Sequence, residues 1–176
     1  METYARHSLK DRMIGAAKLE VATYEEVERD TGATGQAALV VLIVAVAAAI
    51  GGAQAGSEGF IGGLVSAFVG WLVWAAVTWL IGDKLLGGTA TWGELLRTLG
   101  FAQSPGVLYV LGIIPLLGWL VRLVVAVWLL IAGVIAIRQA LDFSTGRAIG
   151  TAVLGWVAYG LVAALMMWVF GWGPGT

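Results

Sequence analysis

Five long runs without a charged residue set the strongest limit on what this chain can fold into. They cover residues 31–57, 59–82, 98–121, 123–137 and 148–176. Four of them hold at least 24 residues. A helix rises about 1.5 Å per residue and the hydrocarbon core of a bilayer is about 30 Å thick, so roughly 20 apolar residues are enough to cross it. The runs therefore predict a protein that crosses a membrane several times.

The short fourth run lies between Arg122 and Arg138 and holds 15 residues. Arginine has an aliphatic stem that can pass through the hydrocarbon edge while its guanidinium stays at the interface. With both stems included, residues 119–140 can serve as a span.

The composition excludes a soluble globule and divides the chain in two. It is 60% hydrophobic and 12% charged, which leaves too few polar residues to cover a water-facing surface. Residues 1–30 carry five of the ten Lys and Arg and seven of the eleven Asp and Glu. We therefore expect an all-α integral membrane helical bundle. Residues 1–35 would form a cytoplasmic helical segment, and residues 36–173 a membrane domain of five transmembrane helices with amphipathic surface helices.

The basic residues predict the orientation, because positively charged loops tend to stay in the cytoplasm. With the amino terminus inside, the five basic residues of the tail and the pairs after the second and fourth spans all lie inside. Those pairs are Lys84 with Arg97, and Arg138 with Arg147. Arg122 alone lies outside, at the outer interface near Glu58 or in contact with a lipid headgroup or a substrate. The carboxyl terminus is then expected outside.

The third span is the weak point of this prediction. Pro105 and Pro115 leave only residues 106–117 as an obvious membrane segment, about 18 Å of helix. Either a helix begins near Leu99 and is kinked at Pro105, or residues 99–118 form a re-entrant hairpin. The hairpin would place the carboxyl terminus inside.

Before the first span, Ser8 can cap a helix over residues 9–29. Its apolar positions Met13, Ala17, Val21 and Tyr24 share one side. Basic residues dominate its start and could rest on anionic lipid, while acidic residues dominate its end. The alternatives are a solvated helix and a protein-docking surface.

A second surface helix is predicted over residues 92–100. Thr91 and Glu94 have the spacing of a capping box, and an apolar stripe follows at helical spacing. The stripe consists of Trp92, Leu95, Leu96 and Leu99. We expect this helix to lie flat on the cytoplasmic face.

Small residues four apart predict close helix packing, since in lipid glycine lets backbones approach one another. The pattern joins Gly59 with Gly63, Gly62 with Ser66 and Gly70, and Gly146 with Gly150. Packing of spans within one subunit is the first interpretation. Contacts between copies in a homo-oligomer are the alternative.

Catalytic chemistry finds little support in these residues. The single histidine, His7, lies in the tail, and the chain has no cysteine. An intramembrane serine–histidine dyad, a helix metal motif and thiolate sites are therefore excluded. We predict no catalytic, cofactor-binding or metal-binding residue, no enzymatic activity and no nucleic-acid partner.

Several short stretches resemble a known family when taken in order. Residues 12–19 (RMIGAAKL), 24–28 (YEEVE) and 33–37 (ATGQA) resemble the start of bacterial members of the Yip family, the Ypt/Rab-interacting proteins. Residues 99–102 (LGFA) with Pro105, 114–118 (IPLLG), Trp128 and 138–141 (RQAL) resemble its membrane domain. The resemblance implies a compact helical domain in a bacterial plasma membrane. The family's eukaryotic relatives take part in vesicle traffic.

The predicted function is that of a non-enzymatic membrane adaptor or organiser, which binds the bilayer and a protein partner through its cytoplasmic helices. The candidate partner or lipid contacts are Tyr24, Glu25, Glu26, Glu28, Trp92, Arg97 and Arg122. The alternative is a small transporter or channel, whose path would need polar groups that converge between helices. Those polar groups would be Gln54, Gln103, Ser104, Tyr109 and Arg122.

Overall fold

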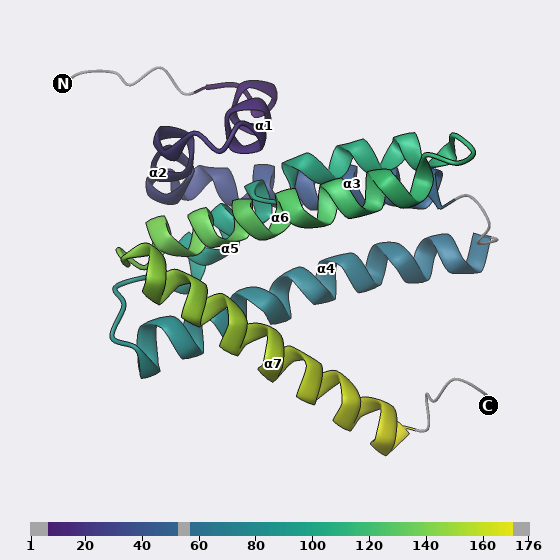
Figure 1. Cartoon of the computed structure of the whole chain (residues 1–176). Helices are drawn as coiled ribbons and strands as arrows, with labels where there is room; N and C mark the ends of the chain where they lie inside the picture. Colours follow the sequence, from purple (N-terminus) through teal and green to yellow (C-terminus); the bar gives the residue numbers. More distant parts are fainter. Residues whose placement is uncertain (1–6, 53–56, 171–176) are drawn as a thin grey trace.

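The computed structural model describes residues 7–52 and 57–170, and every regular element in them is helical. In these two ranges, seven α-helices and three segments of 3₁₀- or π-helix follow one another (Figure 1). They are α1 (Leu9–Ala17), α2 (Val21–Arg29), η1 (Thr31–Ala33), α3 (Thr34–Gly51), α4 (Ser57–Trp79), η2 (Leu80–Leu85), α5 (Trp92–Phe101), η3 (Ser104–Ile113), α6 (Gly118–Ala140) and α7 (Thr145–Phe170). The all-helical prediction is confirmed.

Three of the expected spans are helices long and apolar enough to cross a membrane. They cover Thr31–Gly51, Phe60–Leu85 and Gly118–Ala140. The last helix, α7, is 26 residues long. The segment expected to form the third span is not one long helix.

The amino-terminal segment differs from the single helix predicted over residues 9–29. Ser8 does cap its start, since its side-chain oxygen accepts a hydrogen bond from the Asp11 amide at 3.2 Å. The helix then ends at Ala17, and Leu19 adopts a left-handed φ of 64°, which reverses the chain into α2. Gly15 lies where the two helices meet, and a β-carbon there would overlap Thr23. The break lets the two short helices pack on each other and bury Ala16, which one straight helix could not do.

The chain after the second span forms α5 and then η3, a 3₁₀-helix. A 3₁₀-helix rises about 2.0 Å per residue, so the ten residues of η3 reach about 20 Å where an α-helix would reach 15 Å. Pro105 at the start of η3 needs no backbone partner for its nitrogen. The longer reach offsets the small number of residues between the two prolines.

The segment from α5 through η3 runs beside α3 in one direction. Gly100 lies against Ala37 at the beginning of α3, and Gly106 lies against Val44 in its middle. The backbones of Tyr109 and Gly112 meet Gly51 at its end. The chain turns only after this point, where Leu116 has a φ of 68°, and α6 brings it back.

The second predicted surface helix is present but does not lie on a surface. Both halves of the Thr91–Glu94 capping box are formed, so the predicted start of α5 is confirmed. Every residue from Leu95 to Phe101 is buried, because α5 packs against α2, α3, α4 and α6. The expectation that it lies flat on the cytoplasmic face is therefore wrong. Leu95, Leu96 and Leu99 of the predicted stripe face other helices, and only Trp92 at its start is exposed.

The core lies at one end of the long helices. Figure 1 shows α1, α2 and α5 gathered at that end, while α4 and α7 diverge from α6 towards the other. Large side chains buried there include Tyr24, Leu95, Phe101, Ile137 and Leu141. The far halves of the long helices expose apolar side chains such as Ile61, Val65, Leu123 and Leu161. Tight packing is therefore concentrated where the amino-terminal helices join the membrane domain.

Candidate functional site

The amino-terminal unit, defined as α1, α2 and the turn between them, is organised around Arg12. This side chain is only 1% exposed. Its Nε and Nη2 both donate to Glu26 Oε1, at 2.9 and 2.8 Å, and Nη2 also donates to Asp30 Oδ2 at 2.7 Å. Its Nη1 donates to Gln36 Oε1 on α3 at 2.9 Å. One guanidinium therefore joins α1, α2 and the first turn of α3.

The electrostatics of this cluster favour its charged form. Burial alone would lower the pKa of the Arg12 guanidinium, but hydrogen bonds with Asp30 and Glu26 outweigh burial and raise it. Burial alone would likewise raise the pKa of the Glu26 carboxyl. Hydrogen bonds from His7, whose Nδ1 lies 2.5 Å from Glu26 Oε2, and from Arg12 hold that pKa below its ordinary value. Arg12 is thus a structural ion-pair partner and not a free cation.

Three side chains of the membrane domain donate hydrogen bonds to the amino-terminal unit. Arg97 on α5 is 5% exposed, and its guanidinium donates to the backbone carbonyls of Val27 and Glu28 in the last turn of α2. The negative end of the α2 helix dipole also stabilises a cation at this position. Trp128 Nε1 on α6 donates to the Ala17 carbonyl at 2.8 Å, and Gln139 Nε2 donates to Glu25 Oε1 at 3.1 Å. The unit is therefore fixed against α5 and α6.

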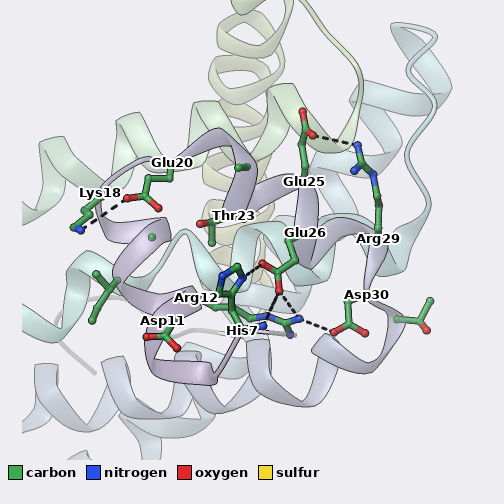
Figure 2. A pocket seen from close by; sticks show the side chains of 14 residues that line it. His7, Asp11, Arg12, Lys18, Glu20, Thr23, Glu25, Glu26, Arg29 and Asp30 are labelled. Carbon is green, nitrogen blue, oxygen red and sulfur yellow. Dashed lines mark hydrogen bonds and ion pairs between the residues drawn. The ribbon is translucent and has the colours of Figure 1, made fainter. Parts of the chain in front are cut away.

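A polar groove of about 900 Å³ runs over the outer side of this unit (Figure 2). Lys18 and Glu20 lie at one end, Glu25 and Arg29 at the other, and the Arg12 cluster lies between them. Five carboxylates and three basic side chains line it, which gives a net charge of −2 with His7 neutral. The carboxylates are those of Asp11, Glu20, Glu25, Glu26 and Asp30, and the basic side chains are those of Arg12, Lys18 and Arg29.

The two ends of the groove carry its accessible charges. Lys18 and Glu20 form an exposed ion pair at 3.9 Å, and Arg29 and Glu25 form one at 3.1 Å. Exposed pairs of this kind contribute little stability and exchange readily for other partners. Arg12 at the centre of the groove and Glu25, which accepts from Gln139, are therefore committed to holding the fold, while Lys18, Glu20 and Arg29 are exposed at the ends of the groove.

Glu28 faces away from this groove, towards the joint with the membrane domain. Burial, followed by the charges of Glu94 on α5 and Asp142 after α6, raises the pKa of its carboxyl to about 7. The Arg29 charge opposes this shift and the Glu25 charge adds to it. The charge of the Glu28 carboxyl therefore changes with pH near neutrality.

The seven predicted contact residues do not form one exposed surface. Glu25 and Glu26 line the groove, and Trp92 is 37% exposed at the start of α5. Tyr24 and Arg97 are instead buried: the Tyr24 hydroxyl donates to the Ala16 carbonyl at 3.0 Å, and Arg97 holds α2. Neither can meet a partner directly.

Arg122 is exposed on α6. Its predicted neighbour Glu58 has a side chain outside the described residues, so that pairing stays a prediction.

Several glycines of the small-residue pattern have open space beside them within this chain. A β-carbon added at Gly63, Gly146 or Gly150 would meet no atom within 4 Å. Ser66 is exposed and Gly70 is half-buried, while Gly59 lies outside the residues with described side chains. Close approaches occur instead at Gly51, Gly82, Gly88, Gly100, Gly106 and Gly112. At Gly51, Gly100 and Gly112 the neighbour includes the backbone of a facing segment, whereas at Gly82 and Gly106 it is the side chain of Leu141 or Val44. Spacing along the chain does not show which segment lies opposite.

Sequence reasoning also missed Arg12, Gln36, Trp128 and Gln139 as parts of the site. The signal for Arg12 was that its charge interrupts the apolar side of α1, which indicates a partner when the helix is packed. Within the described ranges, no group of three or more His, Cys, Asp or Glu side chains could hold a metal ion.

Comparison with known proteins adds one finding to this geometry. The family model for the Yip1 domain matches residues 20–171, from the start of α2 to the end of α7. Helix α1 lies before the match. No curated protein and no solved structure matches the chain.

Proposed function

The chain belongs to the Yip1 domain family, and from this membership we propose that it is a membrane adaptor whose α1–α2 groove docks a cytoplasmic protein partner. The family consists of non-enzymatic proteins of membrane trafficking, so the prediction that the chain is a multi-pass membrane protein and not an enzyme is confirmed. The proposal concerns what it binds and through which surface. The membrane we propose is a bacterial plasma membrane, because the motifs resemble bacterial members.

The proposed topology has five crossings. In it, α3, η3 with the end of α5, and α7 run outwards, while α4 and α6 return. Contacts at both ends support this order. Gly51 at the end of α3 meets Gly112 at the end of η3, and Gly82 in η2, which continues α4, meets Leu141 just after α6. The groove then lies on the cytoplasmic side with the amino terminus.

One observation supports the adaptor role above all: a charged groove is held rigidly on a membrane domain by buried side chains. A surface that is already ordered loses little conformational entropy when a partner binds. Its accessible ion pairs, Lys18–Glu20 and Glu25–Arg29, offer both signs of charge to a partner. Such pairs contribute orientation and specificity more than affinity.

Photocrosslinking from the groove tests this proposal. A photoreactive residue at Ala22, which is exposed in the groove, would be compared with one at Leu85, which is 71% exposed and outside it. We expect one protein adduct from Ala22 in native membranes and none from Leu85. We also expect Arg29→Glu, at an exposed position of the groove, to remove that adduct, and the purified partner to form it with the unaltered chain. Adducts of equal yield at both positions, or an adduct that Arg29→Glu leaves unchanged, would contradict docking at the groove.

The transporter alternative has no comparable support. The Ser104 hydroxyl donates to the Phe101 carbonyl at 2.6 Å, and Arg122 is exposed on the outside of α6. Ser104 is therefore engaged with the backbone, and Gln54 lies outside the described residues. Contacts between copies remain a further proposal, compatible with the open surface around Gly63 and Ser66.

A further inference from the structure

The turn between η3 and α6 exposes only apolar side chains. We define this tip as residues 113–120 (IIPLLGWL). Residues 98–121, which include it, contain no charged residue. Six large side chains of the tip are exposed, namely Ile113, Ile114, Leu116, Leu117, Trp119 and Leu120. A turn that faces water is normally rich in polar residues, so the composition of the tip does not suit water.

The turns at the opposite end of the long helices follow the ordinary pattern. The loop after η2 exposes Thr89, and the turn between α6 and α7 exposes Asp142 and Ser144. The Thr89 hydroxyl donates to the Asp142 carboxylate at 2.9 Å and joins the two turns. The chain thus has polar turns on the side that the proposed topology places in the cytoplasm and an apolar tip on the other. This contrast indicates different surroundings, because exposed apolar surface is unfavourable in water.

The backbone of the tip is ordered and presents Leu116 at its apex. Leu116 has a φ of 68°, in the left-handed region that leucine rarely adopts, and its side chain is 90% exposed. The Leu117 amide donates to the Ile114 carbonyl at 3.2 Å, and the Val121 amide donates to the Leu117 carbonyl at 2.9 Å. The turn therefore holds an apolar side chain outwards in an unfavourable conformation, and that side chain gains little contact within the chain in return.

The tip continues the apolar surface that the two adjoining helices expose. Leu108 and Leu111 on η3 and Leu123 and Val124 on α6 are all exposed. In a multi-pass membrane protein, lipid covers such sides of the spans. Helix α6 has 23 residues and is about 35 Å long, against about 30 Å for the hydrocarbon core. A tip at the outer boundary of that core therefore agrees with the length of α6, and the same lipid can cover both.

Arg122 supplies one positive charge directly beside the tip. It lies four residues after the beginning of α6 and is exposed. Among the residues that the structure describes, its side chain forms no ion pair and no hydrogen bond. Side chains of a helix lean towards its amino terminus, so the Arg122 stem leans towards the tip and can carry the guanidinium to the headgroups. A guanidinium binds phosphate oxygens in a bidentate way, and Trp119, three residues earlier, is of a type that favours this boundary.

We propose that the tip enters the outer leaflet at the boundary between acyl chains and headgroups, and that Arg122 beside it binds the phosphate of a phospholipid. The turn between η3 and α6 is then a membrane anchor and not a loop in water. This inference rests on the proposed topology for the choice of leaflet. It does not depend on the amino-terminal groove or on a protein partner.

A spin label tests the depth of the tip. The chain has no cysteine, so Leu116→Cys and, as a control in a polar turn, Ser144→Cys give single labelling sites at exposed positions. In nanodiscs of phosphatidylethanolamine and phosphatidylglycerol, solvent reaches both faces of the bilayer. We expect the label at residue 116 to be protected from a water-soluble nickel chelate and accessible to oxygen, and the label at residue 144 to show the reverse. Equal access of the chelate to both labels would overturn the proposal.

Phosphatidylethanolamine with a photoreactive headgroup tests the phosphate site in the same nanodiscs. In the unaltered chain we expect adducts within residues 113–123. Arg122→Gln should lose most of them and Arg122→Lys should keep most, because an ammonium group also binds phosphate. Arg138→Gln, which alters an exposed arginine at the other end of α6, should leave them unchanged.

Two results would overturn the phosphate site. One is an adduct yield that Arg122→Gln leaves unchanged. The other is a yield that rises in Glu58→Gln, which would mean that Glu58 holds Arg122 in the unaltered chain. Neither the depth of the tip nor these adducts involve the groove, so failure of groove crosslinking would leave both results unaffected.

Discussion

At the scale of single residues, the site depends on one buried cation. Arg12 donates to two carboxylates and a glutamine, which come from α2, the turn after it and α3. Removing one partner of a buried ion pair leaves the opposite charge uncompensated in a poorly solvated place. The exposed pairs at the ends of the groove carry no such penalty.

Replacing Arg12 should therefore release the amino-terminal unit. For Arg12→Met we expect a loss of about 3–5 kcal/mol in the stability of α1 and α2, because Glu26 and Asp30 lose the buried guanidinium that they share. Hydrogen exchange of the amides in these helices measures the loss. Arg29→Met is the matched control, since Arg29 is 75% exposed, and it should change stability by less than about 1 kcal/mol. Unchanged exchange in Arg12→Met would show that the cluster does not hold the unit.

Glu28 should make stability depend on pH. Its pKa is about 7 in the folded chain against an ordinary value of 4.5, so between these values the folded chain binds more protons than the unfolded chain. The contribution of Glu28 is therefore fully present below about pH 4.5 and is lost as the pH rises towards 7. The stability of the unaltered chain minus that of Glu28→Gln should fall between about pH 5 and pH 7 and then level off. Unfolding in mixed micelles measures it, and a flat or rising difference would contradict this assignment.

At the scale of elements, the third passage depends on contact between η3 and α3. Gly106 allows it, because a β-carbon there would lie 2.5 Å from Val44 Cγ1. Gly63 on α4 has no neighbour within 4 Å of that position. The two glycines therefore have different roles although both lie in apolar helical sequence.

Alanine at these two positions should have effects of opposite sign. Gly106→Ala should destabilise the chain by about 1–3 kcal/mol through overpacking against Val44. Gly63→Ala should stabilise it by up to about 1 kcal/mol, because alanine favours the helix and meets nothing. Unfolding in mixed micelles compares the variants. Equal destabilisation by both would mean that Gly63 packs against a helix within the chain, or against a second copy if the loss depends on protein concentration.

At the scale of the whole molecule, the direction of each membrane crossing decides which surfaces lie on the same side of the membrane. The amino-terminal unit lies at the end where α4 and α6 finish, which puts the groove and the loop after η2 on one side. An odd number of crossings puts the carboxyl terminus on the other side. A re-entrant third segment would make the number even.

Single cysteines decide between these topologies. We expect an impermeant maleimide to label Thr176→Cys in intact cells and Leu85→Cys only after the membrane is permeabilised. Five crossings place residue 176 outside and Leu85 in the cytoplasm. Labelling of both only after permeabilisation would favour the re-entrant hairpin.

The sequence by itself determined that most of the chain lies in lipid and that its fold is all-helical. Long uncharged runs must leave water whatever their neighbours, so the all-helical membrane fold follows from composition and run length. Local signals also sufficed at Ser8 and at Thr91 with Glu94, because a cap requires only residues within one turn.

Tertiary structure alone decided which polar residues are exposed and which are buried in hydrogen bonds with distant segments. Arg12 and Arg97 look like surface cations in the chain and are buried because carboxylates or carbonyls from distant segments meet them. Gly106 and Gly63 both lie in apolar helical sequence and differ because Val44 lies beside only one of them. These choices depend on which segments are neighbours in space, and hydropathy carries no information about that.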